Sequence, residues 1–119
     1  MAVNNVVLMG RLTADPELKI TTTNKEVCGF NLAVDKYKEG ADFIPCVAWE
    51  KNAEFLCNYF KKGSMVAVVG RLQSRKYEDK DGNNRNVTEV VVDRFSFTGE
   101  RKQDNQKAEE FPPVEDTLI

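Results

Sequence analysis

Residues 42–92 contain the patterns that decide the fold. They run DFIPCVAW (residues 42–49), KKGS (61–64), MVAVVGRLQSRKY (65–77) and, after a polar segment, VTEVVV (87–92). Short apolar runs bounded by Gly, Pro, Asn and Asp are typical of strands. The stretch therefore predicts three strands. The last two form a long projecting hairpin, joined by a flexible polar loop over residues 78–86 with Asp81-Gly82 as its turn signal.

Two more long strands precede this stretch. In residues 6–12 and 28–35, large apolar side chains recur at even-numbered positions, so these positions are expected to face a core. Between them, residues 18–20 read as a short strand and residues 21–25 as a turn. The upstream half of the chain therefore predicts a meander.

One short helical pattern interrupts the strands. Ala53, Leu56, Cys57 and Phe60 fall at i, i+3, i+4 and i+7, which places them on one helix face. Gly63 is then expected as the C-terminal cap, after two lysines in the last turn. Five long strands with one helix between the third and fourth match the order of a mainly all-β OB-fold, a five-stranded Greek-key barrel.

A repeated phrase supports a barrel. Residues 7–12 and 67–72 both end in Gly-Arg-Leu, and glycine inside a strand often marks the bend that closes a barrel. Chance convergence of two strand sequences is the alternative explanation. The pattern predicts an OB-fold domain over residues 1–102.

The amino-acid composition excludes several classes of protein function. The 119 residues, 41% of them apolar and 30% charged, suit one domain and a tail, with neither a membrane span nor a signal segment, so a cytoplasmic protein is expected. The absence of histidine excludes the usual zinc sites and a histidine base. Cys28, Cys46 and Cys57 lack CxxC spacing and are expected to be reduced and buried. Neither a metal nor a cofactor is expected.

The charge is divided unevenly. Residues 1–102 hold 16 Lys and Arg against 14 Asp and Glu, whereas residues 103–119 hold one Lys against five acids. The last segment also contains two adjacent prolines and no periodic apolar pattern, which predicts a disordered acidic tail. The segment is either an inert solubilising tail or a docking segment, in which Glu115, Asp116, Leu118 and Ile119 bind partners or compete with a ligand for a basic surface.

The predicted third and fourth strands have unusual outer faces. If Ile44, Cys46 and Ala48 fill the barrel, then Phe43, Pro45, Val47 and Trp49 point outward, as packing residues or as a ligand surface. Counting by twos from Arg71 gives Gln73, Arg75 and Tyr77 on one face, and we expect the two faces to adjoin. Residues 61–85 carry seven basic side chains against three acidic ones.

Aromatic rings interleaved with cations on strands suit single-stranded nucleic acid. Each ring stacks on any base while the cations follow the phosphates. Duplex DNA hides its base faces, and no basic helix is arranged for a major groove. The pattern predicts sequence-tolerant binding of unpaired bases.

Residues 3–97 resemble the bacterial and phage single-stranded DNA-binding proteins. The resemblance is carried by residues 3–12 with 15–17, by 30–34, 42–44, 47–49, 61–64, 70–72 and 75–77, and by 87–92, in that order and spacing. It implies a homotetramer without catalytic activity that protects single-stranded DNA in replication, recombination and repair.

The resemblance also implies residue roles. The stacking positions are Phe43, Trp49, Tyr77 and, in the loop after the second long strand, Tyr37. Phosphate or strand contact is expected from Lys51, Lys62, Arg75 and Lys76, and, from strand alternation and local charge, from Arg11, Arg71, Gln73 and Arg85. The chain departs from the family in having one tryptophan, a short loop over residues 35–42 and an unusual Leu118-Ile119 ending.

Other hypotheses remain at this point. With the even positions of the first strand inward, Val3, Val7 and Met9 form an outward apolar row on an edge, which predicts self-association. A protein-interaction module of a primosome or plasmid-transfer complex and a single-stranded RNA binder are the alternative functions. An enzyme is not expected, because Asp42, Glu50 and Glu54 come without a phosphate loop or nucleophile signature.

Overall fold

The computed structural model describes residues 2–96. The predicted domain boundary at residue 102 and the acidic tail over residues 103–119 lie outside the described residues. Within them, the element order is β1 (Val6–Leu12), β2 (Lys19–Ile20), β3 (Glu26–Asp35), β4 (Ala41–Trp49), α1 (Lys51–Tyr59), β5 (Met65–Glu78) and β6 (Asn84–Ser96).

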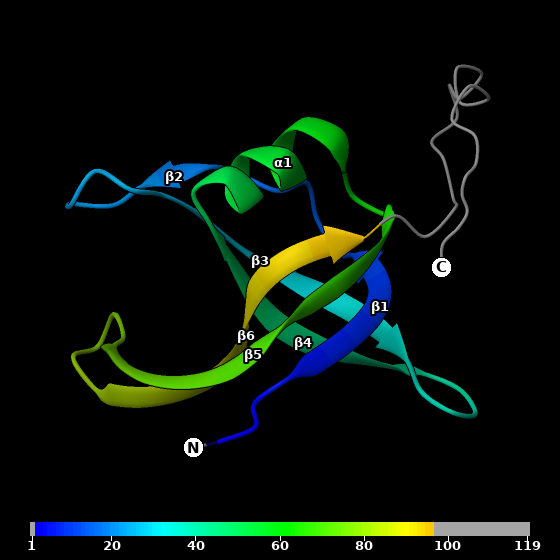
Figure 1. The fold of residues 1–119 in the computed structure, drawn as a ribbon. Helices are drawn as coiled ribbons and strands as arrows, with labels where there is room; N and C mark the ends of the chain where they lie inside the picture. The colour runs from blue at the N-terminus through cyan, green and yellow to red at the C-terminus, as the bar shows by residue number, and fades with distance from the viewer. Residues whose placement is uncertain (1, 97–119) are drawn as a thin grey trace.

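The five long strands close into a barrel. Their order is β1-β5-β6-β4-β3, and β1 also pairs with β3, which joins the two ends of the sheet. All pairings are antiparallel except β4 with β6, which run parallel at Cys46↔Val90 and Val47↔Val91. The short β2 adds only to the edge of β3. The OB-fold and the position of its helix are thus confirmed (Figure 1).

Both glycines of the repeated Gly-Arg-Leu phrase lie where the backbone of another strand approaches closely. A Cβ atom at Gly10 would overlap the carbonyl oxygen of Ala33, and one at Gly70 would overlap that of Val91. At Gly10, β1 passes from pairing with β5 to pairing with β3, and at Gly70, β5 leaves β1 while its register with β6 shifts. The repeat therefore has a structural cause in barrel closure.

The core follows the predicted alternation. Side chains of even-numbered positions on the strands, together with the buried face of α1, fill the interior; the fully buried or nearly buried members include Leu12, Cys28, Leu32, Cys46, Ala48, Ala53, Leu56, Val66, Val68 and Val90. Of the three cysteines, two are buried and Cys57 is half-buried, and all three are free thiols.

Helix α1 lies across one end of the barrel, as Figure 1 shows, but it ends earlier than expected. Phe60 is the C-cap and is already extended, because its ring turns toward Phe55 and Phe95, with centroids 5.8 and 6.3 Å away. Gly63, the predicted cap, lies three residues further on. It adopts a positive φ in the turn before β5 and donates its N–H to the carbonyl of Leu12.

The β5–β6 hairpin curves away from the barrel (Figure 1), and its loop is shorter than the predicted residues 78–86. Pairing continues to Glu78↔Asn84, which leaves residues 79–83 as the loop. The carboxylate of Asp79 accepts the N–H groups of Asp81 and Asn83 and the Nε of Arg85. One acidic side chain thus organises the tip.

No helix among residues 2–96 is long and apolar enough to cross a membrane.

Candidate nucleic-acid interface

The odd-numbered side chains of β4, of β5 and of β6 as far as Val91 share the outer face of the sheet. Register places Val47 beside Val91 and Val91 beside Arg71, so the three strands present one continuous surface. We call this surface the platform face; its members are Phe43, Val47, Trp49, Arg71, Gln73, Arg75, Tyr77, Arg85, Val87, Glu89 and Val91. The prediction that the outer faces of β4 and β5 adjoin was wrong, because β6 lies between these two strands.

Three aromatic rings of the platform face reach solvent. Phe43 is 66% exposed, Trp49 38% and Tyr77 45%. Between them, Val47 and Val91 are buried and form an apolar floor. Large aromatic groups left in water on a flat sheet face are unusual in a soluble domain and mark an interaction site.

Glu89 lies within this face and is only 5% exposed. It is paired in register with Gln73, which donates from Nε2 to Oε2 at 3.1 Å. Arg75 donates from Nε to the same oxygen at 2.7 Å and from Nη2 to Oε1 at 3.4 Å. This carboxylate raises the pKa of Arg75. The Arg75 guanidinium carbon also lies 5.8 Å from the ring centroid of Tyr77.

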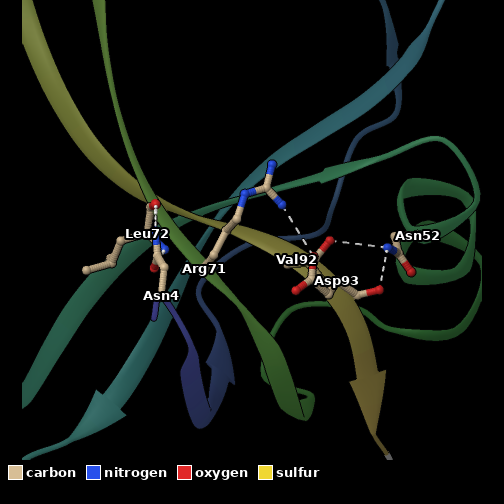
Figure 2. A network of polar contacts seen from close by, with 6 residues as sticks. All are labelled: Asn4, Asn52, Arg71, Leu72, Val92 and Asp93. Carbon is tan, nitrogen blue, oxygen red and sulfur yellow. Dashed lines mark hydrogen bonds and ion pairs between the residues drawn. The ribbon is translucent and has the colours of Figure 1, made fainter. Parts of the chain in front are cut away.

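A bulge in β6 fixes the other end of the face. Register shifts between Val69 and Gly70 leave Asp93 as an extra residue, whose side chain meets Nη1 of Arg71 at 3.4 Å. Figure 2 shows Asn52 of α1 reaching the bulge, where its amide donates to the carbonyls of Val92 and Asp93 at 3.3 and 3.2 Å. The helix therefore supports the bulged strand beneath Arg71.

The remaining predicted cations are spread over several surfaces. Lys76 alternates to the face of the hairpin opposite Arg75. Arg85 is paired in register with Tyr77, so it lies on the platform face, where its Nε meets Asp79 at 2.9 Å. Arg11 lies across from Ala33, itself the neighbour of Phe43, and donates from Nη1 to the carbonyl of Gly63 at 2.9 Å.

Three further predicted residues lie off the sheet. Lys51 begins α1, two positions after Trp49, and Lys62 lies in the turn before β5, with its backbone N–H bonded to Asp15. Tyr37 is almost fully exposed in the loop between β3 and β4. The platform face thus gathers three of the four expected rings and three of the seven expected cations, namely Arg71, Arg75 and Arg85.

The outer face of β1 is apolar and exposed. Val7 and Met9 lie opposite Val69 and Ala67 of β5, and Val3 precedes them in exposed backbone. The side chain of Asn4 forms two hydrogen bonds with the main chain of Leu72, one to the carbonyl at 2.9 Å and one from the N–H at 2.8 Å (Figure 2). The side-chain amide of Asn4 thus extends the hydrogen bonding between β1 and β5 beyond the last backbone pair, Val6↔Gly70.

Sequence reasoning missed Glu89, Asp93 and Asp79 as partners of the expected cations. A single acid inside the apolar run of residues 87–92 was the available signal for Glu89, because a charge is rarely buried unless it is paired. The predicted tail residues Glu115, Asp116, Leu118 and Ile119 lie outside the described residues.

Comparisons with known proteins agree with this geometry. The family model described as the single-strand binding protein family matches residues 3–98. The single-stranded DNA-binding protein 2 of Clostridium acetobutylicum is 47% identical, over 97% of this chain and 92% of the relative. The single-stranded DNA-binding protein of Clostridium tetani is 53% identical over 79% and 69%, and that of Enterococcus faecalis is 44% identical over 88% and 59%. The chain belongs to the single-strand binding protein family.

Proposed function

We propose that this protein binds single-stranded DNA with little sequence preference and protects it during replication, recombination and repair. The observation that carries the proposal is the platform face, on which Phe43, Trp49 and Tyr77 remain exposed around an apolar floor. Rings of this kind stack on the flat face of any base, whereas hydrogen bonds to base edges are not needed. Membership of the family supports the same ligand.

The phosphates require cations near the rings. Arg71 lies on the platform face, while Lys51 and Lys62 are at the surface of α1 and of the following turn. We assign these three to phosphate contact, with Arg11 as a further contact beside Phe43. Arg85 and Lys76 lie along the projecting hairpin, where they meet a strand that extends beyond the barrel.

Titration with oligo(dT) tests the proposal. Trp49 is the one tryptophan of the chain, so stacking on it should quench the intrinsic fluorescence. The logarithm of the binding constant should fall linearly with the logarithm of salt concentration, with a slope of about −0.7 per neutralised phosphate. Wild-type protein that neither binds oligo(dT) nor shows this salt dependence would contradict the function. Tighter binding of oligo(U) than of oligo(dT) would favour an RNA ligand instead.

The exposed row on β1 favours self-association. Val3, Val7 and Met9 form an apolar surface beside β5 that a monomer would leave in water. We propose that this surface joins copies of the chain into a homotetramer. Sedimentation that shows only monomer at micromolar concentration would contradict it.

The acidic tail is proposed as a docking segment for replication or repair enzymes through Glu115, Asp116, Leu118 and Ile119. Deleting residues 104–119 should leave DNA affinity equal or higher and abolish binding of such an enzyme in a pull-down. If the enzyme still binds the protein that lacks residues 104–119, the tail is not the docking segment.

A further inference from the structure

Glu89 is the only buried charged or polar residue among residues 2–96, and it lies in the middle of the surface proposed for DNA. A carboxylate there repels phosphates. It is expensive to bury unless its oxygens are hydrogen-bonded to charged donors. Each oxygen accepts a hydrogen bond from the charged Arg75 on the neighbouring strand, and Oε2 also accepts one from the neutral amide of Gln73.

The hydrogen bonds to Glu89 hold the Arg75 guanidinium by the edge that carries Nε and Nη2. Nε and Nη2 both point at Glu89, with the shorter contact at 2.7 Å, while about half of the Arg75 side chain stays exposed. The same guanidinium lies beside the Tyr77 ring, 5.8 Å from its centroid. Its plane is therefore fixed next to an aromatic ring before any ligand arrives.

The pairing also neutralises Arg75. If a phosphate took the arginine away, Glu89 would keep its charge at a buried site with only Gln73 as donor, which is strongly unfavourable. By contrast, stacking a base on the exposed part of the guanidinium leaves the pair intact.

Resting on the proposed function, we infer that Glu89 is a positioning residue that makes Arg75 a stacking element of the platform face, contiguous with Tyr77, rather than a counter-ion for phosphate. Arg75 then contributes to the salt-independent part of the affinity for single-stranded DNA. The ion pair contributes no net counter-ion release.

The test compares salt slopes for oligo(dT) among wild type, Glu89→Gln and the double variant Glu89→Gln with Arg75→Gln. Removing Glu89 alone frees the Arg75 charge, so the slope should steepen by about 0.7. Removing both members of the pair should return the slope to the wild-type value. The affinity of the double variant at high salt should still fall by about 2- to 5-fold, because the cation–π and stacking contribution of the guanidinium is lost.

Glu78→Gln is the matched control. It removes one negative charge from the same hairpin, at a residue exposed at the end of β5, and should leave the slope unchanged. Urea unfolding of each variant checks that it folds. The double variant replaces both charged partners by neutral amides, so it leaves no unpaired buried charge.

Two results would overturn the inference. One is a double variant whose slope is shallower than wild type by about 0.7, which would show that Arg75 neutralises a phosphate despite Glu89. The other is a folded Glu89→Gln variant with the wild-type slope. Either result leaves the proposed function standing if wild type binds oligo(dT), whereas failure of wild type to bind at all refutes that function instead.

Discussion

Gly70 faces the carbonyl oxygen of Val91 so closely that no Cβ atom fits between the two strands. Because the obstacle is backbone, a side-chain rotation cannot make room. Gly70→Ala should therefore lower the free energy of unfolding by about 1–3 kcal/mol, as overpacking does. Gly29→Ala is the control, since its Cβ would lie 4.0 Å from the nearest atom. It should change stability by about 0.5 kcal/mol or less. Urea unfolding measures both, and equal midpoints would contradict the packing argument.

Removing a ring from the platform face should weaken binding. Trp49→Ala, Tyr77→Ala and Phe43→Ala should each reduce the free energy of oligo(dT) binding by about 1–3 kcal/mol. Tyr59→Ala is the control, because this ring is exposed on α1 and packs against Phe55, outside the platform face. Anisotropy with labelled oligo(dT) measures the affinities. If Trp49→Ala and Tyr77→Ala both bind as wild type does, the stacking role is wrong.

Charging the outer face of β1 should break self-association. Met9→Lys and Val7→Lys each place an ammonium group in the apolar row opposite Ala67 and Val69. We expect sedimentation velocity to show a smaller species than wild type, with an unchanged unfolding midpoint under conditions where both are monomeric. Ile20→Lys, on the exposed edge strand β2, is the control and should sediment as wild type. A charged β1 variant that retains the wild-type mass would place the interface elsewhere.

Two cysteines should be unreactive in the native protein. Burial raises the pKa of the Cys28 thiol to about 11 and that of Cys46 to about 12, so both stay protonated at pH 8. A thiol reagent should modify Cys57, which is half-buried, and reach all three only after unfolding. Cys57→Ser should then show no fast reaction, whereas fast labelling of Cys28 or Cys46 would argue against their burial.

The same shifts predict a pH dependence. An unfolded thiol ionises near pH 8.5, so between about pH 8.5 and 12 the native state binds more protons than the unfolded state, with the Cys28 contribution ending near pH 11. The contribution of the two thiols to the free energy of unfolding should therefore be constant below this range and fall as the pH rises through it. The fall should be smaller in Cys28→Ser, which lacks one of the two shifted thiols.

The sequence predicts which side of each strand is buried, because side-chain alternation is local to the strand. Phe43 and Trp49 are outward, and Cys46 and Ala48 inward, as their parity indicated. Neighbour relations are not local. That β6 separates β4 from β5, and that Glu89 therefore meets Arg75, depends on pairings between distant segments that no single run of residues encodes.

The ends of elements were also set by side-chain contacts that the apolar and polar pattern does not specify. Phe60 belongs to the helical apolar pattern, yet its ring joins Phe55 and Phe95 and α1 ends before it. The hairpin strands run further than their polar composition suggested because Asp79 holds a tight loop. The resemblance to a family supplied the ligand class, whereas the acid that pairs with a predicted phosphate contact became visible only in the fold.

The position of β6 between β4 and β5 sets the number of nucleotides that a single strand needs to reach from Trp49 to Tyr77 on one protomer. Val47, Val91 and Arg71 lie side by side on β4, β6 and β5. Trp49 lies two residues after Val47, and Tyr77 lies six residues after Arg71. Because β4 and β5 run in opposite directions, the two separations add. On a flat sheet these eight steps span roughly 26 Å, and crossing β6 adds roughly 10 Å sideways. A path of about 28 Å corresponds to about eight stacked nucleotides at about 3.4 Å each. Affinity per protomer should therefore rise steeply with oligonucleotide length up to about eight nucleotides. A tetranucleotide that binds as tightly as an octanucleotide would mean that one strand of DNA does not contact both Trp49 and Tyr77.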